Sequence, residues 1–502
     1  MRELSTPEEA ARWFRQRVSG TLQADSRDLG PGDGFIAWPG AARDARAYVG
    51  AALERGASAC LVESTGVDSY KFDSEKIASY SGLKAASGPI AAAYFDHPSR
   101  ALKLLAVTGT NGKTSSAWWL AQALSNLKLA DPLPCAFVGT LGMGLVPEVL
   151  STGMTTPDPV MLQRALGGWL ACGVQACAME VSSIGLQEHR LDGAHIDTAI
   201  FTNLTQDHLD YHGSMAAYWG TKQRLFAWPG LRSAVVNIDD AHGAELASAL
   251  RDRLPDLWSV SSRSAARLRA RDIRYADGGL CFQVCEGGDG PTLQTRLIGD
   301  YNVSNLLGVV AVMRSLGVSL AAATAACADL LPVPGRMQCY GQTGQTLVAV
   351  DYAHTPDALS HALAALRPLA DQRGGQLWCV FGCGGERDAL KRPLMGAVAA
   401  SQADRVVVTS DNPRGERPQA IIDAILPGLG AHPSVSVQAD RALAIAHTLA
   451  QAPVCDVVLI AGKGHEAYQE VAGQRLPFSD ADHVCRALAL RQPAPQQAGV
   501  IS

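Results

Sequence analysis

Apolar and polar positions change in blocks along most of the chain. Short apolar runs of strand length are followed by stretches with an apolar residue at every third or fourth position. An uninterrupted short apolar run is typical of a buried parallel strand, and the spacing of three to four residues is typical of an amphipathic helix. This alternation predicts an α/β fold built on mostly parallel sheets. The expected strands are 104–107, 176–179, 198–201, 234–236, 347–350, 377–381, 405–409 and 457–461.

The first hundred residues are expected to form a smaller α/β unit. Residues 7–18 have a helical pattern, a Gly-Asp turn at 32–34 leads into an apolar run, and a second helix leads into a strand at 59–62. Residues 64–88 are polar and rich in Ser, Lys and Gly, so we interpret them as a surface excursion. We therefore predict three α/β domains, at 1–100, 101–337 and 338–502.

Composition narrows the class of protein. The chain has 502 residues, of which 47% are hydrophobic and 18% charged, and its net charge is −5. These values indicate a globular protein with sizeable cores, and they give no reason to expect a nucleic-acid partner. No apolar run reaches the ~18 residues that a membrane span requires, and the N-terminus is not a signal peptide. The cysteines are scattered, so we expect reduced thiols in a cytoplasmic protein. We also expect the protein to be a monomer.

A glycine-rich turn lies between a buried strand and an amphipathic helix. Glycines allow backbone N–H groups to approach an anion closely, and the following helix N-terminus adds partial positive charge. In this setting Lys113 would neutralise the β- and γ-phosphates of ATP, and Thr114 would place its hydroxyl on Mg²⁺. The alternative is an ordinary turn with an exposed lysine, since the first glycine is closer to Gly-Lys-Thr than in the commonest P-loop. The turn consists of Gly109, Thr110, Asn111, Gly112, Lys113, Thr114 and Ser115.

Other polar groups follow the ends of predicted strands. Glu180 ends the strand 176–179, and ligands of open α/β sheets lie beyond the carboxyl ends of the strands. We therefore expect Glu180 at the magnesium ion of the P-loop, the alternative being a solvated carboxylate. Four loops of the last third follow strands in the same way and are expected to share one cleft. These loops are 351–356, 382–388, 411–414 and 462–466.

Several of these stretches together resemble the Mur ligases, the ATP-dependent amide-forming enzymes of peptidoglycan precursor synthesis. The resemblance covers nearly the whole chain and implies three domains, which bind a UDP-sugar, ATP and the incoming amino acid. It also implies that a substrate carboxylate is phosphorylated to an acyl phosphate, which the amine of the next amino acid attacks. The matching stretches, in this order, are 108–114, 180–183, 202–204, 207–208, 334–336, 351–354, 411–414 and 462–466.

The resemblance implies roles for individual residues, with ATP and Mg²⁺ as cofactors. Lys113, Lys222 and His208 are the implied catalytic residues, and Lys222 is the candidate for a carbamylated lysine, whose added oxygens suit Mg²⁺. Thr114, Glu180, His208 and Lys222 form the implied magnesium environment. Further nucleotide contacts are implied for Asn302, Asn305, Arg336 and Asp351.

For the UDP-sugar, the resemblance implies a site shared by the first two domains. Two positions depart from the family pattern: Ile184 stands where histidine is frequent, and Glu188 stands where a glutamine often contacts the substrate. A carboxylate at Glu188 would face an anionic substrate, so that contact is in question. The implied residues are Ala24, Ser26, Ala41, Ala42, Arg43, Thr155, Thr156, Ser182, Glu188 and Arg190.

The choice of amino acid depends on Arg414. Diaminopimelate differs from lysine by a second carboxylate, which a guanidinium can bind through two parallel hydrogen bonds. The resemblance therefore implies that the chain adds meso-2,6-diaminopimelate to UDP-N-acetylmuramoyl-L-alanyl-D-glutamate. The alternatives are a lysine-adding ligase, a ligase like folylpolyglutamate synthase, and a non-catalytic nucleotide-dependent scaffold. The remaining implied contacts are Arg387, Asp411, Asn412, Pro413, Gly462 and Glu466.

Overall fold

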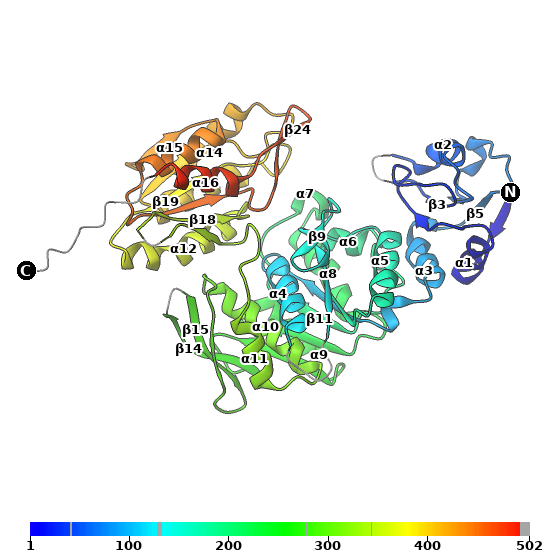
Figure 1. Ribbon diagram of the computed structural model, residues 1–502, viewed down its shortest axis with the longest axis horizontal. Helices are drawn as coiled ribbons and strands as arrows, with labels where there is room; N and C mark the ends of the chain where they lie inside the picture. Colours follow the sequence, from blue (N-terminus) through cyan, green and yellow to red (C-terminus); the bar gives the residue numbers. More distant parts are fainter. Residues whose placement is uncertain (41–42, 128–132, 277–278, 343, 492–502) are drawn as a thin grey trace, which may run out of the picture. The chain divides into compact units, whose positions relative to one another are not determined.

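The computed structural model describes residues 1–40, 43–127, 133–276, 279–342 and 344–491 (Figure 1). Ala41 and Ala42, which were predicted to contact the UDP-sugar, lie outside these residues. The chain forms two compact units, and the domain boundaries at 100 and 337 stay predictions. The first unit comprises Met1–Leu204, Ala216–Leu268 and Gly308–Ala326, and the second comprises Thr205–Met215, Arg269–Leu307 and Cys327–Ser502.

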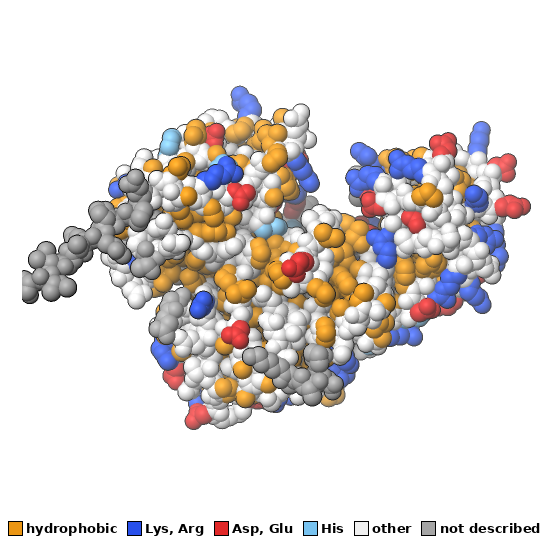
Figure 2. Space-filling model, viewed as in Figure 1, with side chains coloured by type: hydrophobic (Ala, Val, Ile, Leu, Met, Phe, Trp, Pro, Cys, Tyr) orange, Lys and Arg blue, Asp and Glu red, His pale blue; other side chains and the backbone are white. Residues whose placement is uncertain are grey.

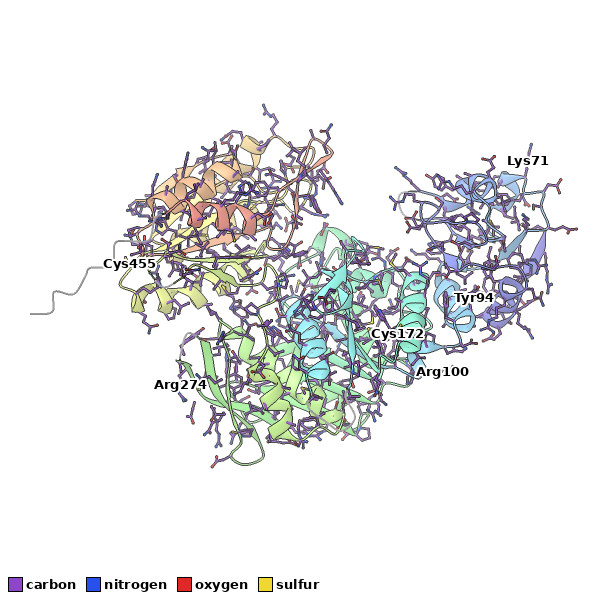
Figure 3. The ribbon with its side chains drawn as sticks, viewed as in Figure 1. Lys71, Tyr94, Arg100, Cys172, Arg274 and Cys455 are labelled. Atoms are coloured by element: carbon purple, nitrogen blue, oxygen red, sulfur yellow. The ribbon has the colours of Figure 1, made fainter. Side chains whose placement is uncertain are left out.

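A parallel sheet with the strand order β1-β5-β4-β3-β2 organises the N-terminal segment. Helices α1 (Pro7–Arg15) and α3 (Leu83–Tyr94) cover one face, and α2 (Val49–Glu54) covers the other. Tyr94, labelled in Figure 3, packs edge-on against Phe14 and so joins α3 to α1. On the face seen in Figure 2, cationic and acidic side chains are interspersed over this segment. Its strands are β1 (Arg2–Leu4), β2 (Leu22–Gln23), β3 (Gly34–Ala37), β4 (Ala59–Glu63) and β5 (Ile77–Tyr80).

The interpretation of residues 64–88 as a surface excursion is wrong. β5 is a buried strand that pairs with both β1 and β4, and α3 begins at Leu83. The strand gives a weak apolar signal because it is four residues long and contains the buried Ser79. The helix contains Gly88 and Pro89, two residues of low helix propensity. Tertiary packing overrides local propensity in this segment.

Eight strands of a second, 11-stranded sheet lie in the first unit, in the order β13-β12-β11-β6-β10-β7-β8-β9. The strands from β13 to β7 run parallel, whereas β8 and β9 are antiparallel. β6 lies between β10 and β11, and its register pairs Val107 with Glu180 and Thr108 with Phe201. The glycine-rich turn, Glu180 and Thr202 therefore leave one edge of the sheet together.

The predicted strands of this sheet are confirmed. The strands are β6 (Lys103–Thr108), β7 (Cys135–Gly139), β8 (Gly142–Leu145), β9 (Glu148–Leu150), β10 (Ala176–Glu180), β11 (Thr198–Phe201), β12 (Ser233–Asn237) and β13 (Asp256–Ser261). The helices of the unit include α4 (Lys113–Ser125), α5 (Pro159–Ala171), α6 (Ser183–Gln187), α8 (Met215–Gln223) and α9 (Ala241–Leu250). The elements that continue the chain are α7 (Leu209–His212), β14 (Leu268–Ala276), β15 (Gly279–Glu286), β16 (Thr292–Gln294), α10 (Tyr301–Ser315) and α11 (Leu320–Ala328).

The C-terminal part of the second unit is a sheet with the strand order β17-β18-β22-β19-β20-β21. All of its strands except β17 run parallel, so the prediction that the four loops leave one sheet edge is confirmed. Helices α12, α13 and α14 cover one face, and α15 and α16 cover the other. Among the described residues, no helix has the length and apolar character that crossing a membrane requires.

The C-terminal elements match the predicted strands closely. The strands are β17 (Gln338–Tyr340), β18 (Leu347–Asp351), β19 (Leu377–Phe381), β20 (Arg405–Val408), β21 (Val435–Val437) and β22 (Val457–Ala461), followed by the hairpin β23 (Tyr468–Val471) and β24 (Gln474–Pro477). The helices are α12 (Pro356–Gln372), α13 (Lys391–Gln402), α14 (Pro418–Leu429), α15 (Arg441–Gln451) and α16 (Asp480–Ala489).

Candidate active site

The glycine-rich turn after β6 is held by the segment that follows β11. Gly109 has a φ of +144°, and a Cβ there would lie 1.9 Å from the Thr202 hydroxyl oxygen. The backbone N–H of Thr110 donates to the Asn203 carbonyl (2.8 Å), and that of Asn111 donates to the Asn203 side-chain oxygen (2.9 Å). Only glycine fits this close approach, so the turn is fixed before α4 begins. Residues 202–204 therefore support the glycine-rich turn, which gives a structural reason why the two stretches occur together in the sequence.

Two lysines converge on one carbonyl of this turn. Lys113 Nζ donates to the carbonyls of Gly109 (3.0 Å) and Thr110 (2.7 Å), and Lys222 Nζ donates to the Gly109 carbonyl (2.7 Å). Lys222 is 1% exposed and lies 4.5 Å from the centre of the Tyr218 ring. Helix α8 thus brings Lys222 from a distant part of the sequence to the phosphate-binding turn. Its implied catalytic role stays a prediction.

Glu180 meets the first turn of α4, as its strand-end position predicted. Its Oε2 accepts a hydrogen bond from the Thr114 hydroxyl (2.9 Å), and its Oε1 accepts one from the Thr140 backbone N–H (2.8 Å). The carboxylate is buried, and Gly139 leaves it space, because a Cβ there would lie 2.2 Å from Oε1. Carboxylate and hydroxyl oxygens are ligands that Mg²⁺ prefers.

The donor set at the turn fits a magnesium ion that keeps part of its hydration shell. In the described part of the chain, no three His, Cys, Asp or Glu side chains are grouped to hold a metal by themselves. Mg²⁺ is commonly bound by one or two carboxylates together with waters and substrate phosphates. Thr114 and Glu180 match this mode of binding. His208 belongs to the second unit, where it precedes α7 with a φ of +53°.

The predicted sugar-binding residues of the central segment form a connected group beside Glu180. The Thr156 hydroxyl donates to the Glu180 carbonyl (3.0 Å) and lies 3.2 Å from the Ser182 hydroxyl. The Ser182 hydroxyl caps α6, and Arg190 Nη1 donates to the Thr156 carbonyl (2.8 Å). Thr155 joins the same group through the Thr140 hydroxyl (3.0 Å), which also donates to Glu180. These four residues therefore lie together within this unit, and their contact with the UDP-sugar stays a prediction.

The N-terminal segment contacts the central segment from α3 and β2. Arg164 on α5 donates to the side-chain oxygen of Gln23 (2.5 Å), next to Ala24. Lys84 Nζ on α3 lies 2.7 Å from Glu188 Oε2. Sequence reasoning missed Lys84, because it falls in the segment interpreted as a surface excursion. Ser26 accepts a hydrogen bond from Arg55 through its carbonyl, and Arg43 is exposed.

The remaining predicted nucleotide contacts lie in the second unit. Asn305 donates to the Asn302 side-chain oxygen (3.0 Å), and Asp351 accepts a hydrogen bond from the Met337 backbone N–H (2.6 Å). The Arg336 guanidinium lies over the Tyr352 ring at 4.5 Å. Burial raises the pKa of Asp351, and Arg336 opposes that shift.

Arg414 is held in place from three sides. Its backbone N–H donates to the Glu470 carbonyl (2.9 Å), and its carbonyl accepts from the Ala472 N–H (2.7 Å). Its Nη1 donates to the Gly385 carbonyl (2.7 Å), and its Nε lies 3.7 Å from Glu470 Oε2. The φ of Arg414 is +51°, a conformation that residues other than glycine seldom adopt. The hairpin β23–β24 therefore fixes the arginine predicted to select the amino acid.

A buried lysine connects the other loops of this edge. Lys463 is 0% exposed, and its Nζ donates to Asn412 Oδ1 (2.9 Å) and Glu466 Oε2 (2.8 Å). Asn412 Nδ2 also donates to Glu466 (2.7 Å). Gly462 has a φ of +118°, and a Cβ there would lie 2.3 Å from the Asp411 carboxylate. Sequence reasoning gave Lys463 and Glu470 no role, since Asn412 and Arg414, which they contact, lie on another loop.

Arg387 comes close to Arg414 across Gly384. A Cβ at Gly384 would lie 2.9 Å from Arg414 Nη1 and 3.7 Å from Arg387 Cγ. Arg387, Asp411, Pro413, Arg414 and the 462–466 loop follow the ends of β19, β20 and β22, which share one sheet edge. An amino acid with two carboxylates and two ammonium groups would find charges of both signs there.

Comparison with known proteins gives matches over the central and C-terminal segments. The model for the Mur ligase middle domain matches residues 107–313, and the model for the Mur ligase glutamate ligase domain matches residues 335–464.

Curated relatives match the chain over nearly its whole length. A UDP-N-acetylmuramoyl-L-alanyl-D-glutamate--2,6-diaminopimelate ligase of Acidovorax sp. (strain JS42) is 62% identical, with 97% of this chain and 98% of the relative covered. A protein of the same name from Janthinobacterium sp. (strain Marseille) is 48% identical, with 94% of each chain covered.

Solved structures of similar proteins agree in fold. A structure of a UDP-N-acetylmuramoyl-L-alanyl-D-glutamate--2,6-diaminopimelate ligase is 34% identical with a TM-score of 0.64, and the match covers 93% of this chain and 94% of that one. MurF from Acinetobacter baumannii is 19% identical with a TM-score of 0.67, covering 91% and 95% of the two chains, and supports the fold alone. The α/β class predicted from the sequence, with a three-domain architecture, is confirmed.

Proposed function

The chain belongs to the Mur ligase family and is an amide-bond-forming ligase, and on this premise we propose that it adds meso-2,6-diaminopimelate to UDP-N-acetylmuramoyl-L-alanyl-D-glutamate with hydrolysis of ATP. The observation that carries this choice of amino acid is the fixed guanidinium of Arg414, held by Gly385 and Glu470 at the sheet edge. A guanidinium pairs with a carboxylate through two hydrogen bonds, and diaminopimelate has the extra carboxylate that lysine lacks.

The phosphate-binding turn supports the first chemical step. A carboxylate is a poor acceptor for an amine, so its oxygen first attacks the γ-phosphorus of ATP and ADP leaves. Gly109, Gly112 and the start of α4 offer backbone N–H groups to the phosphates, and the Lys113 ammonium balances the negative charge that develops. Thr114 and Glu180 would hold Mg²⁺, which supplies further positive charge at the transferring phosphate.

The second step belongs to the incoming amino acid. Its uncharged amine attacks the acyl carbon, the tetrahedral intermediate expels phosphate, and the nitrogen loses a proton to give the amide. Arg414 and Arg387 would bind carboxylates of the amino acid, and Glu466 would bind an ammonium group. The buried Lys463 and Asn412 orient Glu466 for this contact, since both donate to the same carboxylate oxygen. Holding both reactants in place removes much of the entropic barrier to amide formation.

We propose that Lys222 is carbamylated. The Lys113 and Lys222 ammonium groups donate to one carbonyl, that of Gly109, and two cations at one acceptor repel each other. Carbamylation would convert Lys222 into an anionic group with oxygen atoms suited to Mg²⁺. The free thiols of all twelve cysteines support a cytoplasmic site for the reaction, and we propose that the enzyme acts as a monomer.

An ADP-release assay tests the proposal. The enzyme is supplied with ATP and Mg²⁺, with and without the UDP-sugar dipeptide, and with diaminopimelate, lysine or glutamate in turn. We expect ADP only when the dipeptide and diaminopimelate are both present. Equal turnover with lysine would support the lysine-adding alternative, and turnover with glutamate and a folate would support the folylpolyglutamate-synthase-like alternative. No turnover with any combination would support a non-catalytic scaffold.

A further inference from the structure

An ion pair connects α3 of the N-terminal segment with the loop after α6. Lys84 is the second residue of α3, and Glu188 is the C-cap of α6. The distance from Lys84 Nζ to Glu188 Oε2 is 2.7 Å, and the two side chains are 37% and 25% exposed. Their partial exposure leaves both groups accessible to a ligand.

The surroundings of this pair belong to the predicted sugar-binding group. Glu188 lies two residues before Arg190, which donates to the Thr156 carbonyl, and α6 begins directly after Ser182. Arg224 adds another cation nearby, with its Nη1 3.4 Å from the Gln187 side-chain oxygen. Arg190 and Arg224 therefore place two guanidinium groups around the segment that contains Glu188, which suits a substrate that carries a diphosphate and carboxylates.

Glu188 by itself would oppose such a substrate. A carboxylate in a partly desolvated site repels an anionic ligand by more than an exposed carboxylate does, because screening is weaker there. Lys84 lies close enough to cancel this charge. We propose that Lys84 is a further residue of the UDP-sugar site, whose ammonium acts as counter-charge to Glu188 and so allows the anionic substrate to bind. This inference rests on the proposed function, which supplies the anionic substrate.

The packing of α3 does not depend on the ion pair. Gly88 lies against the loop after α6 so closely that a Cβ there would be 1.9 Å from the Asp192 carbonyl oxygen. The apolar side of α3 is buried in the N-terminal core through Leu83, Ile90 and Ala91. A partly exposed ion pair contributes little to stability. Removal of Lys84 should therefore change the charge of the site while α3 stays docked.

Three variants test the inference through the KM for UDP-N-acetylmuramoyl-L-alanyl-D-glutamate, measured by ADP release at saturating ATP and diaminopimelate. In Lys84→Met the pair becomes anionic, and we expect this KM to rise about three- to fivefold, in the range of a single partly exposed charge interaction. In Glu188→Gln the pair becomes cationic, and the KM should fall below the wild-type value. In the double variant the charge is zero again, and the KM should return close to the wild-type value.

Two controls separate a local charge effect from other causes. Arg2→Met removes a cation from another ion pair of the same segment, that with Glu9 at 2.7 Å, and should leave the KM unchanged. Lys84→Arg keeps the charge and should restore most of the affinity. The KM values for ATP and diaminopimelate should change less than about twofold in Lys84→Met, and the ratio of mutant to wild-type KM should shrink at high salt.

Several outcomes would overturn the inference. A wild-type KM in Lys84→Met would mean that the ammonium does not matter for binding. A double variant as impaired as Lys84→Met would exclude charge cancellation, and an equal rise in all three KM values would indicate a structural role. If the wild-type enzyme releases no ADP with the UDP-sugar dipeptide and diaminopimelate, the proposed function and the inference are both overturned. If the wild type is active but all variants have the same KM for the dipeptide, only the inference is overturned.

Discussion

At the scale of single residues, the most informative contact is the carbonyl of Gly109, to which the ammonium groups of both Lys113 and Lys222 donate. Lys222 comes from α8, and its burial beneath the Tyr218 ring leaves it little freedom to move away. Two ammonium groups at one acceptor repel each other, and a carbamate in place of one of them would remove that repulsion. The local electrostatics thus agree with a carbamate at this position.

Lys222→Ala tests the carbamate. We expect ligation to fall to a small fraction of the wild-type rate, because an anionic ligand of the magnesium environment is lost. Short-chain carboxylic acids should partly restore ADP release, since an added carboxylate can occupy the space of the carbamate. Intact mass of the native protein in bicarbonate should show an added carboxyl group on wild type that Lys222→Ala lacks. Absence of both rescue and added mass would contradict the modification.

Arg414→Ala tests the selection of diaminopimelate. We expect the KM for diaminopimelate to rise at least tenfold, which is on the order of the loss of one charge-assisted bidentate contact. The KM for ATP should change less than about twofold. Arg414→Lys should recover little, because an ammonium cannot form the two parallel hydrogen bonds. Arg417→Ala removes an exposed arginine three residues away and serves as the matched control. Equal changes for both substrates would contradict selection by Arg414.

The chemical role of a residue could be predicted from the sequence where the residue belongs to a motif of a few consecutive positions. Lys113, Thr114 and Glu180 meet in space because parallel strands end together, a consequence of the fold class. The contacts of Lys463 with Asn412 and of Lys84 with Glu188 were not predictable, since each joins loops or helices that are far apart in the sequence. In each of the two pairs, the sequence around one residue contains no pattern that indicates its partner.

At the scale of elements, α3 departs most from the sequence prediction. Helix propensity disfavours Gly88 and Pro89, but the missing side chain of Gly88 is what allows α3 to touch the loop after α6. The same glycine that weakened the prediction is therefore required by the packing. In contrast, every predicted strand of the C-terminal sheet is present, because fully buried parallel strands give uninterrupted apolar runs.

Gly88→Ala tests this packing. A Cβ 1.9 Å from the Asp192 carbonyl forces the helix and the loop apart, so we expect the unfolding free energy to fall by about 1–3 kcal/mol, as in other overpacked sites. Thermal unfolding followed by circular dichroism measures the change. Gly50→Ala in α2 is the matched control, because nothing lies within 4 Å of its Cβ position, and it should raise stability slightly. A Gly88→Ala variant as stable as wild type would contradict the contact.

At the scale of the whole molecule, two half-buried histidines of the second unit, His354 and His465, make its stability depend on pH. Burial, together with the nearby Lys391, lowers the pKa of His354 to about 4, and burial with Arg336 lowers that of His465 to about 3. Both imidazoles stay neutral in the native state, whereas an unfolded chain binds protons with a pKa near 6.5. Between these values the unfolded state holds more protons, so stability is full above pH 6.5 and is lost as the pH falls.

Hydrogen exchange of the full chain tests this pH dependence. Between pH 6.5 and 5 the protection of β18 and β22 should fall, by up to about 1.4 kcal/mol per pH unit for each histidine after correction for intrinsic exchange. Strands β6 and β10 of the first unit serve as the internal comparison and should change less. Protection of β18 and β22 that rises or stays constant over this range would contradict the prediction.

Strands β18, β22, β19 and β20 end at one sheet edge, and this arrangement affects how the substrate specificity of such an enzyme can evolve. Each turn at that edge contributes its own contacts, while the apolar core lies in the strands and helices behind it. Evolution can therefore exchange one turn for another without rebuilding the sheet. A library confined to these turns should yield ligases that incorporate other diamines at nearly unchanged melting temperature.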